Sequence, residues 1–134
     1  MREHLYRGKL NHSKEWVQGS LIISQLGNPY IYPNEIIEQD GHHIRFDSDA
    51  PFFVIPETVG QYIGLLDKNG AKIFDNDIVK FRGKIYLVSW HDKFACFAIF
   101  IPNDLDSGLK ICDAKECEII GNATDNPELL EGIK

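Results

Sequence analysis

Glycine and proline interrupt this chain every several residues, and the segments between them are short and rich in Ile, Val, Phe, Tyr and Trp. β-Branched and aromatic residues favour strands, and no long helical periodicity crosses the interruptions. Short strands joined by tight turns favour a small barrel or a curled antiparallel sheet over a parallel sheet. The sequence therefore predicts a mainly β protein with little helix.

The length of 134 residues fits a single domain with a sizeable core. Residues 47–51 gather turn formers and end in a proline, so we expect any seam between two lobes there or at Pro56. The lobes would be an N-terminal β-hairpin lobe over residues 1–50 and a barrel-like lobe over residues 56–134. The sequence leaves open whether they pack as one core.

Local turn signals predict two hairpins in the first lobe. Residues 4–10 and 15–23 form the first, with Trp16, Leu21 and Ile23 facing its core. Asp40-Gly41 is a dipeptide typical of tight hairpin turns and divides the stretch 34–46 into the arms of the second. One helical turn over residues 33–39 is an alternative that the sequence leaves open.

The second lobe repeats the pattern of strand and turn. Asn69-Gly70 is the strongest hairpin signal and joins residues 61–66 to residues 71–74. We expect four further strands in this lobe, at residues 78–81, 84–90, 94–101 and 116–121. The apolar run 94–101 suggests a strand buried on both faces. Pro127 after Asn126 allows one terminal turn of helix.

The formal net charge of −6 disfavours binding to phosphate backbones, which requires an excess of Lys and Arg. Lys80, Arg82 and Lys84 alternate, and on an undistorted strand they would form one basic face. A β-barrel nucleic-acid binder that uses this face is therefore the alternative function.

The three cysteines are an odd number without repeated spacing, which favours a reducing compartment over a disulfide framework. The N-terminus lacks an apolar signal-peptide core, and no apolar run approaches the roughly 20 residues of a membrane helix. We expect a soluble cytoplasmic protein that binds no membrane.

Several residue groups resemble chemical sites but satisfy none of the required patterns. Cys112 and Cys117 have only scattered histidines, His42, His43 and His91, to complete a zinc site. Ser89, His91 and Asp92 are strand neighbours that cannot face one another as a triad. Asp67, Asp75 and Asp77 lack the offsets of a calcium loop and fit turns better. No phosphate-binding glycine loop occurs, so we expect no enzyme and no catalytic, cofactor-binding or metal-binding residues.

Six aromatic residues could form a stacking platform for bases or peptides. The candidates are Trp16, Tyr30, Tyr32, Tyr62, Tyr86 and Trp90. In a small β protein such residues more often fill the core.

Three ordered motifs occur along the chain, of which VGQYIGLLDKNGAKIFDNDIVK at residues 59–80 is the longest. This stretch resembles the pattern Q-[YF]-T-G-L-x-D-K-[ND]-G-x-x-I-[YF]-x-G-D-I-V of the YopX-like proteins, which phages and prophages of Gram-positive bacteria encode. IIGNATDNPELL at residues 119–130 is similar to the family's closing motif, and YRGK with EWVQG is similar to its opening. Asn76 stands where the family usually has Gly, and Ile63 where it usually has Thr. The resemblance carries over no functional residue, because none is established for the family.

The resemblance and the lack of a chemical site together predict a non-enzymatic phage or prophage accessory protein. It would act by self-association or by binding a host or phage protein through exposed strand edges or aromatic patches. We expect a homo-oligomer that needs no cofactor.

Overall fold

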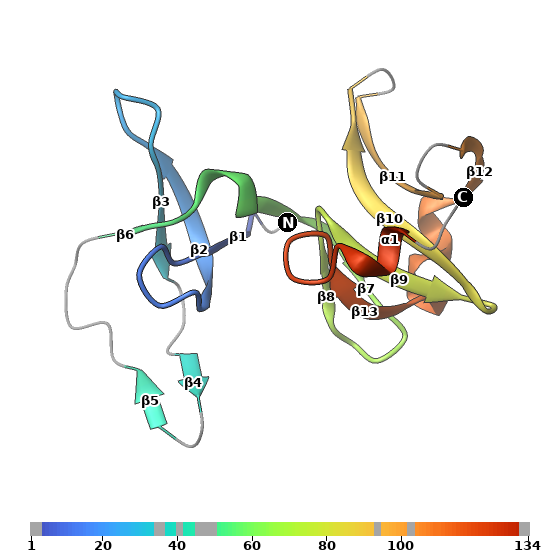
Figure 1. The fold of residues 1–134 in the computed structure, drawn as a ribbon, viewed down its shortest axis with the longest axis horizontal. Helices are drawn as coiled ribbons and strands as arrows, with labels where there is room; N and C mark the ends of the chain where they lie inside the picture. Colours follow the sequence, from blue (N-terminus) through green and yellow to red (C-terminus); the bar gives the residue numbers. More distant parts are fainter. Residues whose placement is uncertain are drawn as a thin grey trace. The chain divides into compact units, whose positions relative to one another are not determined.

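The computed structural model describes residues 4–33, 37–39, 42–44, 51–92, 95–101 and 104–131. The chain is mainly β, with antiparallel sheets and little helix, as predicted. It folds into two compact units, Met1–Gln61 and Tyr62–Lys134 (Figure 1). The division lies further along the chain than residues 47–51 or Pro56, because the segment that follows Pro51 packs into the first unit.

The first unit is built from short antiparallel strands in the order β6-β3-β2-β1-β7. A separate hairpin, β4–β5, pairs Ile37 with Ile44 and Gln39 with His42, which confirms the second predicted hairpin. Its turn at Asp40-Gly41 and residues 34–36 lie outside the described residues, and residues 37–39 are strand. The elements are β1 (Tyr6–Lys9), β2 (Trp16–Ile23), β3 (Pro29–Pro33), β4 (Ile37–Gln39), β5 (His42–Ile44), β6 (Phe52–Phe53), a 3₁₀ turn (Pro56–Thr58) and β7 (Gly60–Leu66).

The sheet of the first unit curls so that the segment after β6 reaches the end of β1. Val54, which follows β6, forms an isolated bridge with Leu10 beside β1, and the Ile55 amide donates to the Lys9 carbonyl at 2.8 Å. Leu10 and Val54 join Val17 and Ile31 as the buried core. The curled sheet predicted for the C-terminal part thus has a counterpart here, where only a hairpin lobe is expected from the sequence.

Two glycines let these strands approach closely. A Cβ on Gly8 would lie 2.9 Å from the Cβ of Val54, and a Cβ on Gly19 would overlap the Tyr32 carbonyl. The core face of β2 is set by these contacts, so Val17 and Gly19 point inward. Trp16 therefore points outward, which contradicts the sequence-based prediction, and Ile23 is 57% exposed at the end of the strand. Leu21 packs against the core as predicted.

The second unit contains a sheet in the order β12-β11-β10-β9-β13, and β7 enters this unit to pair with β8. Its buried core includes Ile73, Val79, Tyr86 and Val88. Among the described strands β12 and β13 remain as edges, so this sheet is curled rather than closed. The elements are β8 (Lys72–Phe74), β9 (Asp77–Phe81), β10 (Lys84–His91), β11 (Cys96–Ile101), β12 (Asp104–Leu109), a 3₁₀ helix (Ile111–Glu116), β13 (Glu118–Asn122) and α1 (Glu128–Glu131).

Most second-unit strands lie where the sequence predicts them, including β13 as the added strand beside β9 and the short terminal helix α1. The interpretation of β11 as buried on both faces is wrong. Ile99 is its buried residue, and Phe97, Phe100 and Ile101 are only partly covered. The prediction also lacks β3, β6, β12 and the two 3₁₀ segments.

Candidate functional site

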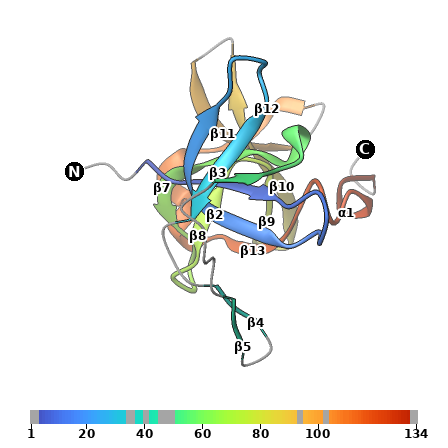
Figure 2. The same ribbon diagram turned by 90° about the vertical axis from the view of Figure 1, so that its left-hand side faces the viewer.

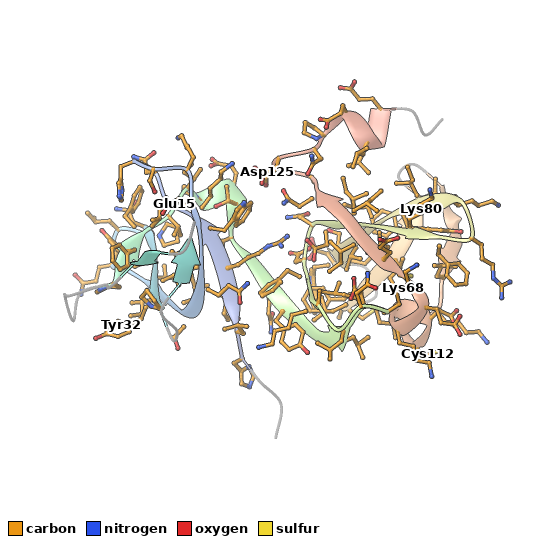
Figure 3. All side chains as sticks on the ribbon, turned by 90° about the horizontal axis from the view of Figure 1, so that it is seen from below. Glu15, Tyr32, Lys68, Lys80, Cys112 and Asp125 are labelled. Carbon is orange, nitrogen blue, oxygen red and sulfur yellow. The ribbon has the colours of Figure 1, made fainter. Side chains whose placement is uncertain are left out.

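The outer face of the first unit carries an apolar row that crosses three strands. Directly paired residues share a face, so the pairs Ile22 with Tyr30 and Tyr30 with Phe53 place all three side chains side by side. The Tyr30 and Phe53 rings meet edge to face at 5.6 Å. Tyr32, two residues beyond Tyr30, lies on the same face and at the surface of the unit (Figure 3). We call Ile22, Tyr30, Tyr32 and Phe53 the outer apolar row.

Much of this row is open to solvent. Ile22 is 45% exposed, Phe53 38% and Tyr32 37%, and all three belong to a unit whose core lies on the opposite face. A large contiguous apolar patch on a folded protein marks an interaction site more often than chance exposure does. The outer apolar row is therefore the candidate interaction surface of this unit.

Cationic side chains border the row at the other end of the strands. Trp16 pairs with Lys9, and the Arg7 guanidinium lies 4.9 Å from the centre of the Trp16 ring. Lys9 also approaches this ring, at 5.8 Å. The cations thus cover the indole, while the row itself is built from uncharged residues.

The predicted stacking platform is divided between the units. Trp16, Tyr30 and Tyr32 share the outer face of the first unit. In the second unit Tyr62 and Tyr86 are buried, and the 46% exposed Trp90 meets Phe97 edge to face at 5.1 Å.

The basic face of Lys80, Arg82 and Lys84, on which the alternative function depends, does not form. Lys80 pairs with Ile85 and Lys84 pairs with Phe81, so the two lysines lie on opposite faces of the β9–β10 hairpin. Arg82 is in the turn itself, with a φ of 47°, followed by Gly83 with a φ of 80°. The chain reverses at these two residues, which is why a simple alternation from Lys80 to Lys84 does not hold.

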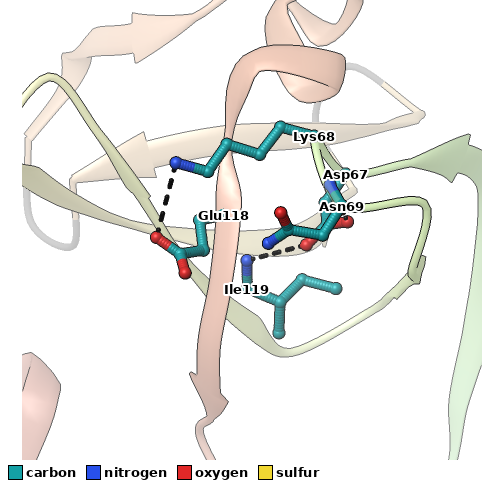
Figure 4. A network of polar contacts seen from close by, with 5 residues as sticks. All are labelled: Asp67, Lys68, Asn69, Glu118 and Ile119. Carbon is teal, nitrogen blue, oxygen red and sulfur yellow. Dashed lines mark hydrogen bonds and ion pairs between the residues drawn. The ribbon is translucent and has the colours of Figure 1, made fainter.

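Asp67 organises the hairpin between β7 and β8. Its Oδ1 accepts hydrogen bonds from the amides of Asn69 and Ala71 at 2.9 and 2.8 Å. Its Oδ2 accepts from the Ile119 amide at 3.1 Å, as Figure 4 shows. Burial raises the pKa of this carboxyl, but the hydrogen bonds from the three amides and the positive charge of Lys68 together lower the pKa by more than burial raises it. The pKa of Asp67 is therefore lowered from the ordinary value of 3.8. Asp67 therefore joins a turn to strand β13.

The Asp75-Asn76-Asp77 turn is also structural. The buried Asp77 Oδ2 accepts from the Phe74 amide at 2.8 Å, and Asp75 Oδ1 accepts from the Trp90 amide at 3.2 Å. Asn76 has a φ of 75°, which confirms that Asn takes the left-handed position where the family usually has Gly. These carboxylates support the turns, as the sequence predicts.

The proposed ligands for metal or nucleophilic chemistry lie in unlike surroundings. Cys112 is exposed, whereas Cys117 is buried and its thiol donates to the Asp113 carbonyl at 3.5 Å. Ser89 and His91 point to the same side of β10, and the residue opposite His91 is Cys96. Within the described part of the chain, no three His, Cys, Asp or Glu residues come together as metal ligands.

No described helix is long and apolar enough to cross a membrane.

The closing motif is a turn that rests on β13. Asn122 Oδ1 accepts from the amides of Thr124 and Asp125, and Asn126 Oδ1 accepts from the Asn122 amide. A Cβ on Gly121 would meet the Asn126 side chain. Together with Gly8 and Gly19, these contacts show that the motif residues build the scaffold.

The scaffold is shared with a solved protein. The crystal structure of protein EF1440 from Enterococcus faecalis is 20% identical and superposes with a TM-score of 0.56, covering 97% of this chain and 99% of that one. At this identity the similarity shows the fold alone. No curated protein matches the sequence. The model of the YopX protein family matches residues 5–131, and this chain belongs to the YopX family.

Proposed function

We propose that this protein is a phage or prophage accessory protein that acts without catalysis, by protein–protein association in the host cytoplasm. The observation that carries the proposal is the outer apolar row, which leaves Ile22, Tyr32 and Phe53 exposed on one face of a folded unit. Aromatic residues free of charged neighbours are typical of the centre of protein interfaces. The phage context rests on the resemblance of the motifs.

The two buried carboxylates of the second unit support the non-enzymatic part of the proposal. Asp67 and Asp77 use their carboxylate oxygens to accept backbone amides of adjacent turns. A general base must instead present its oxygen to a substrate proton. Both carboxylates therefore act as structural groups.

A triple variant tests the proposal. Ile22→Ser, Tyr32→Ser and Phe53→Ser together remove the exposed apolar atoms without adding charge. We expect wild type to associate, with itself in light scattering or with a host or phage protein in a pull-down, and the variant to lose this association at unchanged circular dichroism. A control variant, Ile111→Ser, removes an exposed apolar residue from the second unit and should associate normally. Equal association by the triple variant, or none by wild type, would overturn the proposal.

A further inference from the structure

The β2–β3 hairpin is uncharged throughout its length. No Asp, Glu, Lys, Arg or His occurs from Trp16 to Pro33, in a chain of which 25% of residues are charged. In Figure 1 and Figure 2 the turn of this hairpin extends beyond β1 and β6. Ile22 and Ile23 point to opposite faces near this tip and are 45% and 57% exposed. Neither face of the tip is covered by the unit's own core.

The tip is a hydrogen-bonded turn that presents a leucine to solvent. Its geometry is held by hydrogen bonds from the Ser24 amide to the Asn28 carbonyl and from the Gly27 amide to the Ser24 carbonyl, both 2.9 Å. The Asn28 amide also donates to Ser24 Oγ at 3.1 Å. Leu26, at the centre of this turn, is 89% exposed.

The Asp67 turn in the second unit has the same construction. The Gly70 amide donates to the Asp67 carbonyl, and the Ala71 amide donates to the Asp67 side chain, as Asn28 does to Ser24. Gly27 and Gly70 share a positive φ, 85° and 83°. The position of Leu26 is occupied there by Asn69. The turn itself therefore does not require an apolar residue, and Leu26 is available for a contact outside the unit.

The exposed apolar area is large enough for a modest interface. Ile22, Tyr32 and Phe53 of the outer apolar row, with Leu26 at the tip, expose roughly 400 Å² on one copy, within the range of a single large patch. Two such surfaces would bury about 800 Å² in total, at the low end, where weak and transient complexes lie.

We propose that the occupant of this surface is a second copy of the same chain, and that two copies meet hairpin to hairpin. This inference rests on the proposed function and names its partner. Each copy carries a net charge of −6, so copies repel wherever charged surfaces meet. The hairpin keeps the like charges of two copies apart, because its own residues carry none. An uncharged apolar surface is also complementary to itself, as a twofold contact requires.

The chemistry of the hairpin disfavours the other occupants. A nucleic acid or an anionic lipid surface is attracted by Lys and Arg, and the tip has neither. A strongly charged protein partner would meet no opposite charge along β2 and β3. The second copy supplies the neutral apolar surface that this hairpin fits.

The first experiment compares wild type with Leu26→Asn by light scattering from low to high micromolar concentration. Asn is the residue that the Asp67 turn carries at the same place, so the turn should form and thermal unfolding should be unchanged. We expect wild type to dimerise and Leu26→Asn to raise the dissociation constant roughly a hundredfold, since two leucines leave the contact. The matched control Ile111→Asn should dimerise like wild type. A wild type that stays monomeric throughout would overturn the inference.

The second experiment tests the geometry. Gln25→Cys, in a chain whose exposed Cys96 and Cys112 are replaced by Ser, should cross-link to itself under mild oxidation, because a twofold contact brings the two turns together. A Lys110→Cys control should not. A dimer without cross-linking at Gln25→Cys would refute the hairpin contact. If wild type is monomeric but retains another protein that the Ile22, Tyr32 and Phe53 variant loses, the second copy is the wrong partner and the proposed function stands.

Discussion

Replacing Asp67 tests whether this carboxylate secures the second unit. Asn at this position keeps one carbonyl oxygen for the turn amides of Asn69 and Ala71, but it turns an NH₂ group toward the Ile119 amide, where Oδ2 accepts at 3.1 Å. One charge-assisted hydrogen bond is lost and two donors face each other, so we expect Asp67→Asn to lower the free energy of unfolding by about 2–3 kcal/mol. Asp67→Ala loses all three bonds and should cost about 3–5 kcal/mol.

The stabilising contribution of the Asp67 carboxylate should depend on pH. The pKa of Asp67 is lowered in the folded state, so the ionised carboxylate is favoured by folding. Its contribution is fully present above the unfolded pKa near 3.8 and is lost as the pH falls through the lower, folded pKa. The stability difference between wild type and Asp67→Asn should therefore be constant near neutral pH and shrink below that value.

The chain offers one tryptophan in each unit, Trp16 and Trp90. In a Trp16→Phe background, Trp90 fluorescence during urea titration reports the second unit alone. The free energy of unfolding that Asp67→Asn is expected to lose should lower the urea midpoint of the second unit by about 1–2 M. The exposed Glu116→Gln removes a carboxylate without these bonds and should change the stability by less than about 0.5 kcal/mol. An Asp67→Asn protein as stable as wild type at neutral pH would refute the role assigned to this residue.

Three further predictions concern the scaffold. Gly19→Ala should destabilise the first unit by about 3–5 kcal/mol, because the new Cβ meets the backbone carbonyl of Tyr32, which cannot move aside. Gly121→Ala should destabilise the second unit by only about 1–2 kcal/mol, because its Cβ meets the Asn126 side chain, which can move. Urea titration followed by Trp16 fluorescence measures the first variant, and Trp90 fluorescence measures the second. Asn76→Gly should be neutral and Asn76→Ala should cost about 1 kcal/mol, measured by Trp90 fluorescence, because the φ of 75° suits Gly and Asn and strains Ala. Burial and the nearby Asp113, Glu116 and Asp67 raise the pKa of Cys117, so a thiol reagent at mildly alkaline pH should modify Cys96 and Cys112 rapidly in the folded protein and Cys117 only on unfolding.

Hairpins with a local turn signal could be predicted from the sequence. Asn69-Gly70 joins β7 to β8 as expected, and β4 pairs with β5 as expected, because the turn signal is contained in adjacent residues of the sequence. Strand β3 was not predictable in this way. It begins and ends with proline, Pro29 and Pro33, and these residues resemble the limits of a loop.

The direction in which a side chain points depended on contacts distant in sequence. Trp16 is larger than Val17, and size alone suggests that Trp16 fills the core. The space inside β2 is closed by Val54 and by the Tyr32 carbonyl, so it admits Val17 and Gly19 instead. The uncharged run from Trp16 to Pro33 is the sequence signal that could have identified the candidate interaction surface, because interface centres are depleted of charge.

The motifs of the family and the candidate surface occupy different parts of the chain. Gly8, Gly19, Asp67 and Asn126, all within the motifs, close strands together or hold turns. The exposed residues from Ile22 to Phe53 lie between the opening motif, which ends at Gly19, and the central motif, which begins at Val59. Membership of the family therefore accounts for the scaffold and does not determine the partner. On our proposal, the partner is selected by the side chains that this scaffold carries on β2, β3 and β6.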